Sequence, residues 1–224
     1  MKNKNMRLLK ISKAVLLVII FLTMSSCVGI SADITMRQDG SGRIALQYRF
    51  SRMAEALGRL DGNERWPIIP TGRADIERTL ARIPGMRLVS FSVREDDRDI
   101  INHVELEFNN IETLLTFLDP SGRRASLNRE GGSNRLSVTI MDGTTAPIDT
   151  NLLDLMRELS VGYSFNLSFS ADGNSTLTLL DGSGNAIQAP AGTRIVSSGS
   201  RVSIEMGTGA VLEQEHGLTV VLTW

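Results

Sequence analysis

Apolar and polar residues alternate in several stretches of this chain, which is the pattern of half-buried β-strands. The clearest case is residues 32–50, where two alternating runs flank Asp39-Gly40-Ser41-Gly42, a sequence typical of a β-hairpin turn. The same alternation recurs at residues 89–93, 100–108, 127–140 across two glycines, 163–169, 177–179, 202–206 and 218–224. Each of these runs predicts a strand with one buried face.

Other segments carry apolar residues at helical spacing. Residues 73–83 place Ile76, Leu80 and Ile83 on one stripe, and two further helices are predicted after the capping residues Asn110 and Asp149-Thr150. Ser51 is expected to cap a short helix, and the acidic turn over residues 94–99 is expected to be solvated.

Helices and strands are interspersed, and neighbouring strands are joined as hairpins. The fold class predicted is therefore α+β, an antiparallel β-sheet with helices packed on it and a β-rich C-terminal part from Gly162 onward. A break near residues 141–149 could subdivide the chain, and a single continuous domain fits the sequence equally well.

The first 26 residues differ from the rest and predict a cleaved signal peptide. Five positive charges precede an apolar run that is too short to span a membrane, and the run ends at Met24-Ser25-Ser26-Cys27. This end is similar to the bacterial lipobox, in which the cysteine receives diacylglycerol and becomes the first mature residue. We therefore expect a signal peptide at 1–26, a lipidated Cys27 with a short tether at 27–30, and a folded domain at 31–224. The alternative is an ordinary secretory signal that ends in a chance cysteine.

Cys27 is the only cysteine in the chain, so an internal disulfide is excluded. Lipidation would consume its thiol and hold the exported protein on the inner or outer membrane of the bacterial envelope. Removal of residues 1–26 takes away five of the 24 lysines and arginines and none of the 25 acidic residues, which leaves a net charge of about −6. Nucleic acid is therefore not an expected partner.

The sequence offers no catalytic or metal-binding constellation. The two histidines, His103 and His216, are isolated, and no G-x-S-x-G, phosphate loop or dinucleotide fingerprint occurs. The repeated Asp-Gly pairs lack the further ligands of a calcium loop and are expected to form hairpin turns. We expect no enzyme activity, no catalytic residue, no metal and no cofactor.

One stretch is a candidate for contact with a ligand or a membrane. Trp66, Ile68 and Ile69 stand between prolines that favour extended backbone, and together they would form a stiff apolar tip. The alternative is a loop that folds back over the core.

The Cys27 anchor, the hairpin beginning Ala32-Asp-Ile-Thr-Met, and Gly192-Thr-Arg-Ile-Val ahead of a final strand ending in Trp224 give the chain a likeness to a known family. It resembles the LppM-like bacterial lipoproteins, especially their spirochaete (treponemal) members. The resemblance implies an envelope-associated α+β domain without an assigned enzymatic activity.

Two functional hypotheses follow. In the first, a non-catalytic, lipid-anchored protein binds an amphiphile, such as a lipid, or another envelope component. In the second, a structural lipoprotein recruits other envelope proteins and has no small ligand. An apolar cavity of several hundred Å³ would favour the first, and a solid core with a large exposed patch would favour the second.

Overall fold

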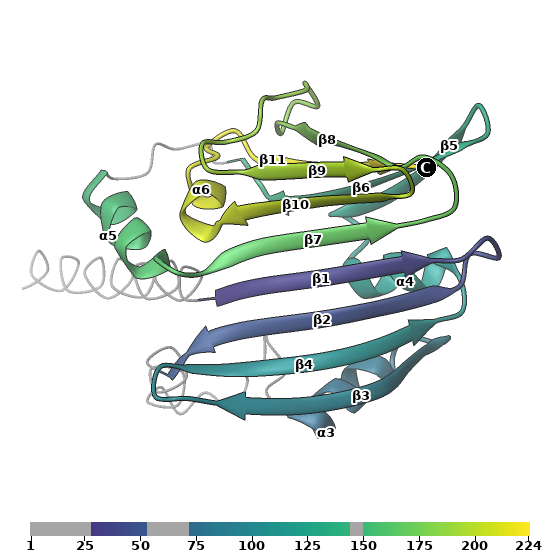
Figure 1. Ribbon diagram of the computed structural model, residues 1–224, viewed down its shortest axis with the longest axis horizontal. Coiled ribbons are helices and arrows are strands. Elements are labelled where there is room, and N and C mark those ends of the chain that lie inside the picture. The colour runs from purple at the N-terminus through teal and green to yellow at the C-terminus, as the bar shows by residue number, and fades with distance from the viewer. Residues whose placement is uncertain (1–27, 53–71, 144–149) are drawn as a thin grey trace, which may run out of the picture.

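Two β-sheets make up about half of the computed structural model, which describes residues 28–52, 72–143 and 150–224 (Figure 1). The larger sheet has, in spatial order, β3 (Met86–Glu95), β4 (Asp99–Phe108), β2 (Gly42–Ser51), β1 (Val28–Met36), β7 (Ser164–Ser170), β10 (Arg201–Gly207) and β9 (Arg194–Ser198). The smaller sheet has β5 (Ala125–Glu130), β6 (Ser133–Met141), β11 (Leu218–Thr223) and β8 (Thr176–Leu180). Among the strands described, β1 and β7 form a parallel pair and the other pairs are antiparallel.

The alternating apolar residues line one face of the large sheet. Ile34 of β1 faces Ile44 of β2, which in turn faces Leu106 of β4, and all three are almost fully buried. On β7 and β10, Phe169 and Val202 continue this face and have no exposed surface. One continuous apolar layer therefore runs across the strands and drives their packing.

This layer is covered in two different ways. The small sheet packs over the half formed by β7 and β10, and the centroid of the Phe169 ring lies 4.8 Å from that of Trp224, which follows β11. Two helices, α3 (Arg73–Leu80) and α4 (Ile111–Leu118), pack beside β3, β4 and β5. The remaining helices, α5 (Thr150–Ser160) and α6 (Thr208–Leu212), contact each other at the end of the sheet where β1 begins (Figure 1).

The predicted fold class is confirmed as mixed α+β with mostly antiparallel sheets. Several local expectations hold as well: the hairpin of β1 and β2, the hairpin of β5 and β6, and the Asn110 cap, whose Oδ1 accepts from the Thr113 amide at 2.8 Å. These features depend on residues that are close in sequence.

Three expectations are corrected. Val28 to Ile30, predicted to be part of a tether, are the first three residues of β1. The run after Asp172-Gly173 does not return as a hairpin, because β7 and β8 belong to different sheets. Asp99, placed in a solvated turn, is 6% exposed. Of the two domain arrangements left open by the sequence, the continuous one is favoured, because strands that precede residue 141 pair with strands that follow residue 149 in each sheet.

The alternation at residues 89–93 is also interrupted. The register of β3 against β4 shifts between Leu88 and Ser90, so Val89 leaves the buried face and is 38% exposed. Such a bulge kinks an edge strand and protects it from pairing with another chain. Cys27, the helix predicted after Ser51, and Trp66, Ile68 and Ile69 lie outside the described residues. Among those that are described, no helix is long and apolar enough to cross a membrane.

Candidate functional site

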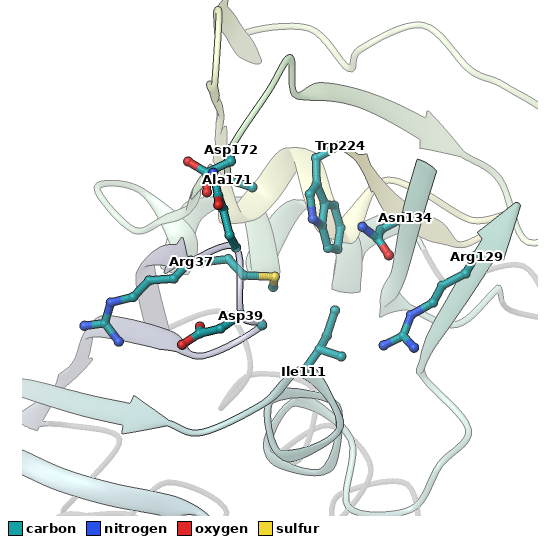
Figure 2. A pocket seen from close by; sticks show the side chains of 11 residues that line it. Arg37, Asp39, Ile111, Arg129, Asn134, Ala171, Asp172 and Trp224 are labelled. Carbon is teal, nitrogen blue, oxygen red and sulfur yellow. The ribbon is translucent and has the colours of Figure 1, made fainter. Parts of the chain in front are cut away.

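A pocket of about 360 Å³ opens at the end of the molecule where β1 turns into β2. Its wall comes from six segments: the β1–β2 turn, the start of α4, β5, the start of β6, the connection from β7 to β8, and the residue that follows β11 (Figure 2). These segments are far apart in sequence, and the two packed sheets bring them together. We call this end of the large sheet the pocket end and the opposite end, where β1 begins, the Val28 end.

An aromatic ring forms the apolar part of the pocket. The Trp224 backbone is clamped to Asn134 by two hydrogen bonds, one from each amide to the other residue's carbonyl, at 2.9 and 3.1 Å. The indole packs at 51° to the ring of Phe169 and points toward Ile111 at the start of α4 (Figure 2). Because the backbone and the ring are both held, the indole is a preorganised surface for a ligand.

The β1–β2 turn supplies charged groups on one side. The Asp39 carboxylate accepts hydrogen bonds from the Ser41 hydroxyl at 2.6 Å and from the Ser41 amide at 2.9 Å. These bonds, together with Arg37, lower the pKa of Asp39, so it is ionised at neutral pH. Arg37 donates to the same hydroxyl at 3.1 Å, and its guanidinium is directed away from Trp224 (Figure 2). Gly40 has a φ of +79°, the left-handed conformation that this turn requires.

Arg129 of β5 reaches toward the pocket from the other side (Figure 2). Its guanidinium lies 3.1 Å from the Glu112 carboxylate, and both side chains are more than half exposed. An ion pair in water at this exposure contributes at most about 1 kcal/mol, so a ligand can compete for the guanidinium at low cost.

The turn that leads from α4 into β5 is fixed by a carboxylate. Asp119 accepts from the hydroxyl and amide of Ser121 at 2.5 and 3.0 Å, and from the amides of Arg124 and Ala125. These donors hold the pKa of Asp119 far below its usual range. The start of β5 is thereby positioned relative to α4, and both elements line the pocket.

The charged groups that line this pocket carry opposite charges in equal number. Its charged lining residues are Arg37 and Arg129 against Asp39 and Asp172, so opposite charges balance. Within residues 28–52, 72–143 and 150–224, no group of histidine, cysteine or carboxylate side chains is arranged to hold a metal ion. The pocket suits a polar, uncharged ligand that has one apolar face.

The structure keeps the residues considered for chemistry apart. His103 lies exposed on the outer face of β4, as the alternation predicts. His216 lies in the turn before β11, where its carbonyl accepts from the Gly182 amide at 2.6 Å. The acidic turn contains Asp96, whose carboxylate accepts from the amides of Arg98 and Asp99 at 2.9 and 2.8 Å. These bonds close the turn from β3 to β4.

The sequence predicts Asp39 and Asp172 only as turn residues and Trp224 only as the end of a strand, so this site was missed. The one sequence feature that pointed to this pocket was the recurrence of Asp-Gly turns, which lie at the ends of strands. Which of those ends meet depends on the order of strands in the two sheets, and no local pattern encodes that order.

The Val28 end contains a polar cluster. The Tyr163 hydroxyl donates to Asp99 Oδ1 at 2.6 Å, and Arg49 Nε lies 3.5 Å from Asp99 Oδ2. The Arg49 guanidinium carbon lies 4.6 Å from the centroid of the Tyr163 ring, and the same side chain donates to the Gly162 carbonyl. This cluster ties β2 and β4 to the turn between α5 and β7.

Comparison with known proteins finds no family model, no curated protein and no solved structure that matches this chain.

Proposed function

We propose that this protein is a lipid-anchored lipoprotein of the bacterial cell envelope that binds an envelope component in the pocket and catalyses no reaction. The observation that carries the proposal is the position of the pocket. It lies where β1 ends, whereas Val28, the residue that follows Cys27, lies where β1 begins. The lipobox-like Met24-Ser25-Ser26-Cys27 supports the anchor, and the resemblance to LppM-like lipoproteins supports the location.

The length of β1 sets the distance between the anchor and the ligand. β1 has nine residues, and a strand rises about 3.3 Å per residue, so the pocket lies about 30 Å from Val28. A protein held at Cys27 would turn the pocket away from the bilayer surface. The ligand would therefore arrive from the space outside the bilayer, which favours an envelope component over an amphiphile that resides in the membrane.

The lining of the pocket suggests the chemistry of this ligand. A sugar ring has an apolar C–H face, which can lie on an indole, and hydroxyl groups that both donate and accept hydrogen bonds. Trp224 and Ile111 supply the apolar surface, while Arg129, Asn134 and Asp172 supply donors and acceptors around it. With the charges balanced, an uncharged envelope glycan is the ligand class that we propose.

One observation favours the alternative, a scaffolding lipoprotein without a small ligand. All five residues of β9 are exposed, and this strand forms an edge of the large sheet with Ile195 and Val196 uncovered. Unprotected edges of this kind accept an extended segment of another protein.

The test follows Trp224 fluorescence during titration of the lipidated protein, in detergent, with tetra-N-acetylglucosamine. Trp66→Phe first leaves Trp224 as the sole tryptophan. We expect a saturable change in emission that is reduced at least tenfold in affinity by combined Arg129→Ala and Asn134→Ala. Arg194→Ala on β9 is the matched control and should bind as the parent does.

A second measurement identifies the competing outcomes. Native mass spectrometry of the purified protein, followed by organic extraction, reports any lipid that co-purifies. A stoichiometric lipid with no response to the glycan would replace the glycan proposal with an amphiphile. A bare protein without a glycan response would favour the scaffolding alternative.

A further inference from the structure

Exposed apolar side chains gather at the Val28 end, away from the pocket. Val161, in the turn between α5 and β7, is 70% exposed, the highest value among the exposed large hydrophobic residues described. Leu155 on α5 is 42% exposed and Ile30 on β1 is 40% exposed. Single exposed apolar residues are common on protein surfaces, so position and rigidity decide whether these have a role.

The turn that carries Val161 is held firmly. The amides of Val161 and Tyr163 donate to the carbonyls of Glu158 and Ser160 at 3.4 and 3.0 Å, and Gly162 has a φ of +85°, which ends α5 with a left-handed residue. Arg49 donates to the Gly162 carbonyl, and Tyr163 is bound to Asp99. Val161 is therefore presented outward by a fixed backbone, which lowers the entropy cost of burying it in a partner.

This turn lies beside the first residue of β1. The Thr208 amide donates to the Tyr163 carbonyl at 3.0 Å, and the Thr208 hydroxyl donates to the Val28 carbonyl at 3.2 Å. Tyr163 also packs against Gly29, where an added Cβ would lie 3.6 Å from its ring. The start of β1 and the Val161 turn thus belong to one surface (Figure 1).

We infer that the Val28 end, through Val161 and Leu155, is a membrane-contact surface that rests on the bilayer carrying the lipid anchor. This inference depends on the proposed lipidation of Cys27. The Cα of Cys27 lies one peptide unit, about 3.8 Å, from that of Val28, and Val28 is already in β1, so no flexible tether separates the acyl chains from the folded body. A body attached in this way has to keep its Val28 end at the interface.

The partner is a lipid surface because the anchor brings the bilayer to this end. The mature chain carries a net charge of about −6, so attraction to anionic head groups does not supply the contact. The exposed apolar side chains beside the anchor supply the contact, because they can enter the boundary between head groups and acyl chains.

The experiment uses the full lipidated protein in vesicles of phosphatidylcholine and phosphatidylglycerol at three to one. Since lipidation consumes the thiol of Cys27, a single Val161→Cys substitution provides a unique site for an environment-sensitive fluorophore. The matched control is Val196→Cys on β9, a valine that is 42% exposed at the edge of the large sheet. We expect lipid-borne nitroxide to quench the label at position 161 at least threefold more than the label at position 196.

Hydrogen–deuterium exchange of the unlabelled protein guards against a label that draws its own site into the bilayer. Vesicles should slow exchange at residues 155–163 at least twofold relative to detergent and leave β9 unchanged. Equal quenching at the two positions, or unchanged exchange at residues 155–163, would overturn the inference.

Mass spectrometry of the same sample separates this failure from that of the proposed function. Acylated Cys27 with a water-exposed Val161 refutes only the membrane-contact surface. An unmodified Cys27 refutes the anchor and the inference together.

Discussion

The two ends of the large sheet are closed by different chemistry. At the Val28 end, Arg49, Asp99 and Tyr163 form a partly buried polar cluster that links three elements through side chains. At the pocket end, the rings of Phe169 and Trp224 pack at a tilt, and carboxylates such as Asp119 hold the turns. Side-chain contacts link the elements at the Val28 end, whereas the elements at the pocket end leave a pocket between them.

This difference shows how one fold can separate attachment from recognition. A polar cluster with specific partners fixes relative positions, which suits an end that we propose to rest on a membrane. At the pocket end, the turns of Asp39 and Asp119 are each held by hydrogen bonds within the turn. No side chain has to cross the space between such turns, which suits a ligand pocket. The substitutions below test this division, beginning with the largest expected effect.

Phe169→Ala should destabilise the protein most, by about 3–5 kcal/mol, because it removes a fully buried ring from the core. Urea unfolding followed by circular dichroism measures the loss. In the Trp66→Phe background, Trp224 emission should also shift, since its aromatic neighbour is lost. Destabilisation below about 1 kcal/mol would show that the pocket end does not depend on this pair.

At the Val28 end, Asp99→Ala should cost about 2–3 kcal/mol, because the Tyr163 hydroxyl and the Arg49 guanidinium lose a buried charged acceptor. Tyr163→Phe removes only the hydroxyl and should cost less, about 1–2 kcal/mol. A double-mutant cycle of the two substitutions measures their coupling. Additive effects would mean that these residues do not act as a cluster.

Asp119→Asn should lower the melting temperature at pH 7 and have less effect in acid. The pKa of Asp119 in the folded protein lies below its usual value of 3.8, so ionisation stabilises the fold above that value. This contribution is lost as the pH falls through the folded-state pKa. The melting temperatures of parent and variant should therefore converge as the pH drops below 3.8. A difference that stays constant with pH would contradict the role of the ionised carboxylate.

Asn102→Leu should have the smallest effect, between no change and a gain of about 1 kcal/mol. Asn102 has no exposed surface, and neither atom of its amide has a hydrogen-bond partner among the described residues. An apolar side chain of similar volume removes the cost of burying an unpaired amide. Thermal unfolding measures the change, and a loss of more than 1 kcal/mol would reveal a polar role for Asn102 at the Val28 end.

The sequence predicts the parts of this fold that depend on nearby residues. Alternation over residues 32–50 places one face of a hairpin in the core, and Asn110 caps its helix through a donor three residues away. The crossing from β7 to β8 was not predicted, because the Asp172 turn resembles a hairpin turn whether the next strand pairs with β7 or enters the other sheet.

The candidate site was predicted less well for the same reason. Asp99 was expected in water because its neighbours are charged, yet Tyr163, 64 residues away, binds and covers it. Trp224, Ile111 and Arg129 become neighbours only when the two sheets have packed. Strand β9 was missed because its five residues are exposed on both faces and show no alternation of burial.

The parallel pairing of β1 with β7 has a consequence for the order in which the protein folds. Ile30 of β1 pairs with Phe165, so the first strand finds one of its neighbours only after roughly 135 further residues have emerged. The hairpin of β1 and β2 can form early, but one edge of β1 stays open while the rest of the chain is synthesised. A chain lipidated at its start would be held at the membrane while the backbone groups on this edge of β1 have no partner strand. Completion of the central sheet is therefore a late event, and the incomplete chain is exposed to aggregation until β7 arrives.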